Sequence, residues 1–157
     1  MENKNLSWFD NVEIRPHPWP GLNWMATILQ VPDVKKARDL YIEVFQLVPI
    51  FDLPDPKNEK ELITTRLRYR GSNILLAKVG LDYDGEAPAA GQNRPPIIFY
   101  LYVDNVDEVY QRALKNGMKS LAEPGETFWG DYRARLQCPM GYIWDIALRL
   151  EANAKLL

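Results

Sequence analysis

The sequence predicts an α+β fold in which two βαβββ modules form curved half-barrels around a central cleft. Three observations lead to this prediction. The chain of 157 residues has the length of one compact domain, and 46% of its residues are hydrophobic, which is enough for a core. The same order of strands and helix also occurs twice, which indicates the architecture before any motif is considered. We expect an irregular N-terminal arm at 1–23, a first module at 24–80, a linker at 81–96, a second module at 97–150 and a tail at 151–157.

Hydrophobic periodicity predicts the elements of the first module. Apolar and β-branched residues at 25–31 indicate a strand. Apolar residues at helical spacing over 34–45 predict a helix with Asp33 as its N-cap. The Arg-Gly-Ser sequence at 70–72 is typical of a tight hairpin turn between two further strands. We expect these strands at 61–69 and 73–79, and an additional edge strand at 48–53.

The second module follows the same order. Residues 97–103 are predicted to form its first strand. Asn105 is positioned to cap a helix, with Glu108 at the capping-box position and Asn-Gly at 116–117 ending it. The remaining strands are expected at 118–122, 128–136 and 142–148.

The two modules align with one another residue by residue. Their first halves align at an offset of 72, and their last strands at an offset of 70. The aligned pairs are Val31 with Val103, Asp33 with Asn105, Gly71 with Gly141 and Ala77 with Ala147. Internal similarity at a nearly constant offset predicts two copies of one structural unit.

Two segments carry a resemblance to a known family. VPDVKKARDLYIEVF includes the predicted first helix, and FWGDYRARLQCPMGYIWDIAL closes the second module. With the paired modules, they resemble the glyoxalase/bleomycin resistance protein/dioxygenase superfamily, also called the vicinal oxygen chelate superfamily. The resemblance covers about residues 24–149 and departs locally at Cys138, where the family usually has aspartate. It implies the fold predicted above, but the family includes isomerases, dioxygenases, epimerases, thiol transferases and non-enzymatic drug-sequestering proteins.

The same resemblance implies where metal ligands would lie. In the metalloenzymes of this family, the first and last strands of each module provide one ligand each, and these positions fall on Ala26, Leu75, Ile98 and Asp145. Three alkyl side chains and one carboxylate cannot hold a divalent cation, which needs about three N, O or S donors. The single histidine, His17, lies in the predicted arm. We therefore expect no metal ion and no other cofactor.

Charge and composition exclude several kinds of partner. A net charge of -2 gives no basic field for nucleic acid, and no apolar run reaches the roughly 20 residues of a membrane span. The N-terminus lacks the apolar segment of a signal peptide, and the single Cys138 fits a reducing compartment, so a cytoplasmic protein is expected. Five tryptophans and eight tyrosines leave apolar surface to cover, which favours a homodimer.

Several aromatic and polar residues are candidates for the walls of the cleft. Tyr100, Tyr102 and Trp129 could stack against a flat ligand, with Gln30 as a hydrogen-bonding residue. Arg135 is a candidate partner for an anionic ligand, although an arginine row could equally form a solvated face. Strand alternation places Tyr100 and Tyr102 on one face with Ile98 and sends Trp144 into the core.

Asp145 leaves two interpretations open. It could be a catalytic acid or base whose pKa is raised by apolar neighbours, or a structural carboxylate satisfied by an arginine or a backbone amide.

The sequence thus favours a metal-independent protein that binds a small organic ligand, aromatic or anionic, between its modules. The alternatives are a metal-free lyase or isomerase that uses Asp145, a metal-dependent glyoxalase or dioxygenase, and a protein whose arm fills the cleft and which acts through partners.

Overall fold

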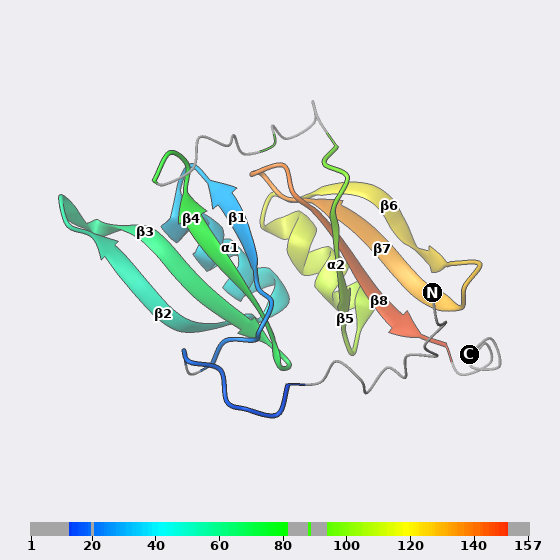
Figure 1. Ribbon diagram of the computed structural model, residues 1–157. Helices are drawn as coiled ribbons and strands as arrows, with labels where there is room; N and C mark the ends of the chain where they lie inside the picture. Colours follow the sequence, from blue (N-terminus) through cyan, green and yellow to red (C-terminus); the bar gives the residue numbers. More distant parts are fainter. Residues whose placement is uncertain (1–12, 20, 82–87, 89–93, 151–157) are drawn as a thin grey trace.

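The computed structural model consists of two four-stranded sheets, each with one helix (Figure 1). It describes residues 13–19, 21–81, 88 and 94–150, so the predicted tail and parts of the predicted arm and linker lie outside the described residues. The first module contains β1 (Thr27–Val31), α1 (Val34–Phe45), β2 (Val48–Asp55), β3 (Asn58–Tyr69) and β4 (Ser72–Lys78). The second contains β5 (Ile98–Tyr102), α2 (Val106–Lys115), β6 (Lys119–Glu126), β7 (Asp131–Gln137) and β8 (Ile143–Arg149). The predicted α+β fold of paired βαβββ modules is confirmed.

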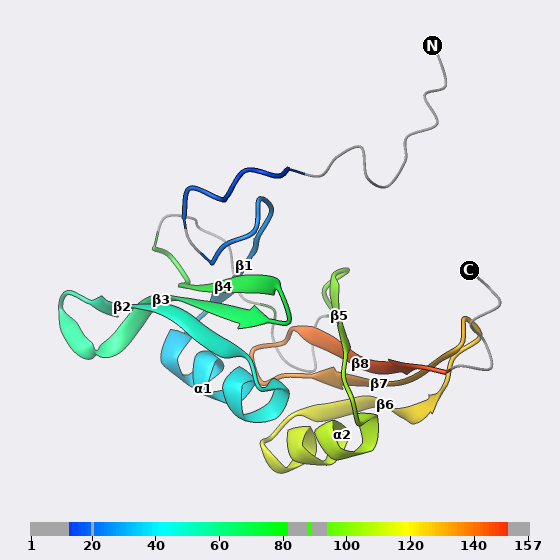
Figure 2. The same cartoon turned by 90° about the horizontal axis from the view of Figure 1, so that it is seen from below.

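The two sheets have the same topology. Their strand orders are β1-β4-β3-β2 and β5-β8-β7-β6, and in each the first strand pairs in parallel with the last. The sheets lie side by side with β1 and β5 toward the middle, and both helices lie on the same side of them (Figures 1 and 2). We call the opposite side of each sheet its open face. Among the described residues, neither helix is long and apolar enough to cross a membrane.

The local signals in the sequence act as expected at the helix starts and at one turn. The Asp33 side chain accepts a hydrogen bond from the Lys36 amide at 2.9 Å, and the Asn105 side chain accepts one from the Glu108 amide at 3.1 Å. Both N-caps are therefore confirmed. In the hairpin between β3 and β4, Arg70 and Gly71 have φ of 44° and 88°, as in the two-residue turns that match the twist of antiparallel strands.

The strand predicted at 128–136 begins later than expected. Residues 128–130 form a turn, and β7 begins only at Asp131. Thr127 and Asp131 exchange hydrogen bonds across this turn, and Gly130 has a φ of 96°, which a strand does not allow. The preceding strand, β6, in turn extends to Glu126 rather than ending at 122.

The core continues from one module into the other through Trp144. This side chain is 1% exposed and lies in the core, as strand alternation predicts. Its ring centroid lies 4.7 Å from that of Phe45, 4.8 Å from that of Tyr41 and 4.9 Å from that of Phe99. Since Tyr41 and Phe45 belong to α1, the helix of the first module packs against β8 of the second.

The Tyr41 hydroxyl also contacts the Cys138 thiol at 3.3 Å, and burial raises the pKa of that thiol, which makes it a poor nucleophile.

Candidate functional site

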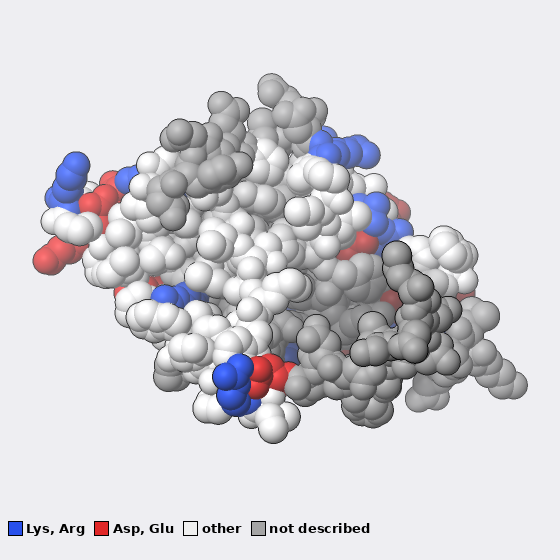
Figure 3. All heavy atoms as spheres, viewed as in Figure 1, with Lys and Arg blue, Asp and Glu red and all other residues white. Residues whose placement is uncertain are grey.

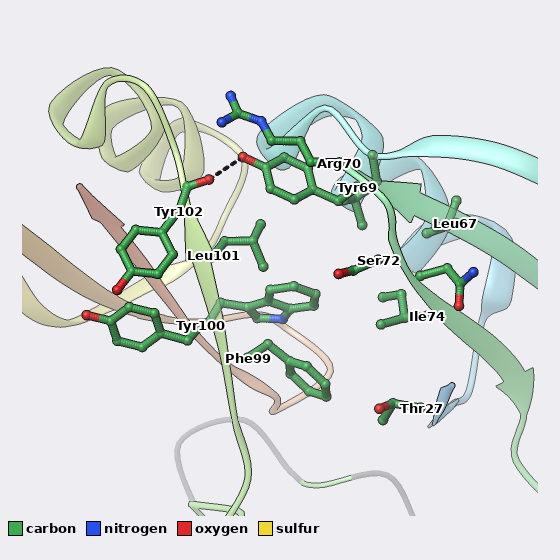
Figure 4. A pocket seen from close by; sticks show the side chains of 13 residues that line it. Thr27, Leu67, Tyr69, Arg70, Ser72, Ile74, Phe99, Tyr100, Leu101 and Tyr102 are labelled. Carbon is green, nitrogen blue, oxygen red and sulfur yellow. Dashed lines mark hydrogen bonds between the residues drawn. The ribbon is translucent and has the colours of Figure 1, made fainter. Parts of the chain in front are cut away.

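A crevice of about 430 Å³ lies between the two modules (Figure 4). Its walls come from β1, β3 and β4 of the first module and from β5 and β8 of the second. Most of the lining is uncharged, and its apolar residues are Leu47, Leu67, Ile74, Phe99, Leu101 and Trp144. Its size is that of a cavity for a small organic molecule.

Two contacts between the modules close one end of the crevice. The Tyr69 hydroxyl donates a hydrogen bond of 2.6 Å to the backbone oxygen of Tyr102 (Figure 4). Nearby, Arg70 forms an ion pair of 2.8 Å with Asp104. Arg70 is the single charged residue among the described residues of the lining, and its charge is matched by this partner. The crevice therefore presents a nearly neutral surface to a ligand.

Tyr100 and Tyr102 belong to the β5 wall of the crevice, but their rings point away from Ile74, on the side of β5 opposite to Leu101 (Figure 4). A buried carboxylate holds both hydroxyls. Asp131 is fully buried and accepts hydrogen bonds from Tyr100 at 2.7 Å and Tyr102 at 2.9 Å. Its carboxylate also accepts from the Trp129 indole at 3.2 Å and from Arg149 at 3.4 Å. Four donors thus satisfy one carboxylate, and the two tyrosine rings are held in place on their side of β5.

This network shifts the acidity of its members. Burial alone would raise the pKa of Asp131, but hydrogen bonds from Tyr100, Tyr102, Trp129 and Arg149 outweigh it, so the pKa lies below the usual value. Burial, followed by the hydrogen bond to Asp131, raises the pKa of Tyr100 to about 12. Both shifts keep the carboxylate ionised and the phenols protonated at neutral pH.

Asp145 lies at the centre of the second sheet's open face, where arginines enclose it. It is 1% exposed, and its two oxygens accept hydrogen bonds from Arg135 Nε and Nη2 at 2.7 and 2.9 Å. Arg133 adds a third hydrogen bond at 3.2 Å. Two guanidinium groups thus engage both oxygens of a buried carboxylate, an arrangement that satisfies its charge. Asp145 does not line the crevice.

Comparison with known proteins identifies the fold family. The family model described as the glyoxalase/bleomycin resistance protein/dioxygenase superfamily matches residues 21–146, most of the chain. The chain belongs to this superfamily. Among curated proteins, the chain is 27% identical over 125 residues to the uncharacterized protein Mb0911c of Mycobacterium bovis. This alignment covers 75% of this chain and 78% of that protein. The chain is equally similar to the uncharacterized protein Rv0887c of Mycobacterium tuberculosis, covering 69% of that protein.

Solved structures of the superfamily share the fold. A glyoxalase-related enzyme from Fulvimarina pelagi superposes with a TM-score of 0.64 at 17% identity, covering 81% of this chain and 88% of that one. TioX from Micromonospora sp. ML1 gives a TM-score of 0.62 at 19% identity, covering 80% of this chain and 98% of that one. These likenesses concern the architecture alone.

The residues at the superfamily's metal-ligand positions do not fit a metal ion. Leu75 lies opposite Ile28 in the sheet register, Asp145 lies opposite Tyr100, and Ala26 and Ile98 supply only alkyl groups. Asp145, the one potential ligand, already gives both oxygens to arginines. Within the described ranges, histidine, cysteine, aspartate and glutamate side chains form no group of three or more that could hold a metal. This donor set does not support a metal centre.

The structure brings only some of the predicted site residues together. Tyr100 and Tyr102 line the crevice, whereas Gln30, Trp129 and Arg135 do not. Trp129 lies in the turn before β7 and acts through its hydrogen bonds to Tyr100 and Asp131, at 3.2 Å each. The side-chain oxygen of Gln30 is buried without a hydrogen-bond partner, while its backbone oxygen accepts a bond of 2.8 Å from Tyr142.

Two residues of the site were missed in the sequence. Asp131 shares strand parity with Arg133 and Arg135, so alternation along β7 could have indicated its face. Asn73, which also lines the crevice, is 9% exposed and donates a hydrogen bond of 2.9 Å to the backbone oxygen of Gly21 in the arm. This contact depends on the path of an irregular segment, and no sequence pattern predicts it.

Proposed function

We propose that the chain binds a small organic molecule with a flat, apolar body in the crevice between its modules, without a metal ion. The observation that carries this proposal is the lining, in which apolar side chains of both modules, among them Ile74, Phe99 and Leu101, face one another (Figure 4). Apolar walls provide affinity through burial of ligand surface, and the aromatic rings of Phe99 and Trp144 in these walls suit contact with a flat ligand. The paired charge of Arg70 leaves the lining without a net charge that would select an ion.

Asp145 is less well suited to a role in catalysis. A general acid or base must reach the reacting atoms, but Asp145 is buried beneath Arg133 and Arg135, and the crevice lies elsewhere. These contacts favour the structural interpretation of this carboxylate. We therefore propose a binding protein rather than an enzyme that uses Asp145.

A binding assay with a neutral fluorescent probe tests the proposal. N-phenyl-1-naphthylamine should bind saturably at one site per chain, with increased emission. Ile74 of β4 points into the crevice (Figure 4), so Ile74→Trp should fill it and weaken binding about tenfold or more, since the lost apolar contact of a buried ring system is about 1.5–3 kcal/mol. Leu148→Trp, at a residue 40% exposed and outside the crevice lining, is the matched control and should bind as the parent does.

Metal independence is tested on the same preparation. Exhaustive dialysis against a chelator should leave the probe affinity unchanged, and elemental analysis should find no stoichiometric Zn, Ni, Mn or Fe. Unchanged affinity in Ile74→Trp would contradict the proposed location, and loss of affinity after chelation that added metal restores would contradict metal independence.

A further inference from the structure

The open face of the first sheet carries two arginines with unused hydrogen-bonding capacity. Arg66 and Arg68 lie two positions apart on β3 and therefore on the same face. Across residues 13–150, as far as the structure describes them, no hydrogen bond or ion pair reaches either guanidinium. Arg68 is exposed, and only Nε of the three Arg66 nitrogens is buried without a partner.

Two aromatic rings hold the Arg66 guanidinium. Its central carbon lies 5.0 Å from the centroid of the Phe51 ring, on the neighbouring strand, and 5.1 Å from that of the Trp19 ring, in the arm. Cation–π contacts restrain the guanidinium but use none of its N–H donors. The edge formed by Nη1 and Nη2 is therefore available, and this edge matches a planar carboxylate with two parallel hydrogen bonds.

The second module shows what such an arginine binds in this fold. Arg135 lies opposite Asp145 in the register of β7 and β8 and forms two hydrogen bonds with its carboxylate. In the first module, Arg66 lies opposite Leu75 at the equivalent place. The arginine is thus present in both modules, but its register partner is a carboxylate in the second module and a leucine in the first.

Among the described residues, no acidic side chain occupies a register position beside these two arginines. The other register positions beside Arg66 and Arg68 are occupied by uncharged residues, namely Ile28, Thr64, Asn73, Leu75 and Ala77. In Figure 3 the surface over the first sheet is largely uncharged, with a small group of basic side chains over β2 and β3. Poorly polar surroundings strengthen the attraction of these two positive charges for an anion.

We propose that Arg66 and Arg68 form a binding site for the carboxylate group of a small organic acid. The ligand's carboxylate takes the role that the Asp145 side chain has in the second module, and the Trp19 and Phe51 rings flank it. This site lies on the open face of the first sheet and does not depend on occupancy of the crevice.

Titration with 4-fluorobenzoate, followed by fluorine NMR, tests this site. The neutral 4-fluorobenzamide has the same shape and serves as the matched ligand. Because hydrogen bonds between charged groups are strong, we expect benzoate to bind about tenfold or more tightly than the amide. Arg66→Met should remove this preference while keeping the apolar stem between the two rings. Arg94→Met removes one positive charge at an exposed residue before β5 and should leave the preference unchanged.

A second variant keeps the arginine but supplies the missing carboxylate. Leu75→Asp reproduces the pairing of Arg135 with Asp145, so it should weaken benzoate binding as much as Arg66→Met does. Circular dichroism confirms that each variant is folded, and Arg68→Met provides a further test at an exposed position. The proposal is overturned if benzoate does not bind, if it binds no better than benzamide, or if Arg66→Met binds it unchanged. Displacement of benzoate by an equal concentration of inorganic phosphate would assign the site to phosphate and overturn the carboxylate assignment.

Discussion

Replacing Asp145 with asparagine separates a structural role from a catalytic one, because the side chain keeps its shape and loses its charge. The carboxylate accepts three hydrogen bonds from Arg135 and Arg133, the longest of 3.2 Å. Removing one partner of a buried ion pair costs about 3–5 kcal/mol, since the other charge is left uncompensated. The Arg135 and Arg133 side chains are 32% and 18% exposed, so water can solvate them in part. We therefore expect Asp145→Asn to lower the free energy of unfolding by about 2–3 kcal/mol.

Thermal unfolding measures this loss. For a chain of this length, each kcal/mol lowers the melting temperature by about 2–4 °C, so the decrease should be roughly 5–10 °C. Asp39→Asn is the control, because Asp39 is 55% exposed where it meets Arg38, and it should change the free energy by at most about 0.5 kcal/mol. Probe binding in the crevice should be retained by both variants.

A double-mutant cycle of Asp145→Asn with Arg135→Gln measures the interaction energy between these two side chains. Residues in direct contact couple by about 0.5–3 kcal/mol, and we expect a value within the upper half of that range. A melting temperature unchanged by Asp145→Asn, together with lost binding or lost turnover of any substrate, would refute this reasoning and restore the catalytic interpretation.

Further predictions concern the tyrosine network, a tight turn, a helix cap and the assembly. Tyr100 holds its proton more tightly in the folded chain than at the ordinary pKa of 10.0, so its contribution to stability is present below pH 10 and is lost as the pH rises to about 12. In NMR of ring-labelled tyrosine, Asp131→Asn should lower this pKa but keep it above 10.0, because burial remains; an unchanged value would contradict the network. Gly141→Ala should destabilise the fold in denaturant titration by more than about 1 kcal/mol, since its φ is 89° and the methyl group would overlap the Pro88 carbonyl. Asp33→Ala should cost about 1 kcal/mol through the lost cap, measured in the same way. Light scattering should give the mass of a homodimer at tens of micromolar, and a monomer mass would refute that expectation.

The sequence predicts the features that depend on short-range residue patterns, such as helix caps and buried strand positions, and those that depend on the internal repeat. The offsets place Leu75 and Asp145 at equivalent positions, and in the structure they lie opposite Ile28 and Tyr100, which are equivalent to one another at the offset of 72. Caps and turn residues act within a few positions of themselves, so Asp33 and Asn105 could be assigned to helix starts from the sequence. Strand alternation likewise places Trp144 in the core.

The candidate site depends on contacts that no local pattern contains. The partners of Asp131 on β5 lie 31 and 29 residues earlier in the chain, and which donors reach it is set by tertiary packing. The cleft was predicted with Asp145 and Arg135 in its walls, but the crevice follows from how the modules pack, with α1 held against Trp144. The predicted start of β7 at residue 128 was wrong, because Gly130 adopts a turn conformation that the hydrophobic pattern does not indicate.

The packing of α1 against β8 has a consequence for how a duplicated unit can diverge. Tyr41 and Trp144 meet across the boundary of the two halves, and their counterparts at the repeat offsets are Ala113 and Ile74. Large rings therefore occupy one set of repeat-equivalent positions, while smaller side chains occupy the other. The crevice is lined by Ile74 and also by Trp144, so it includes one residue of each size. Side chains of different size at equivalent positions of the two modules therefore shape the volume between them, within elements that both modules share.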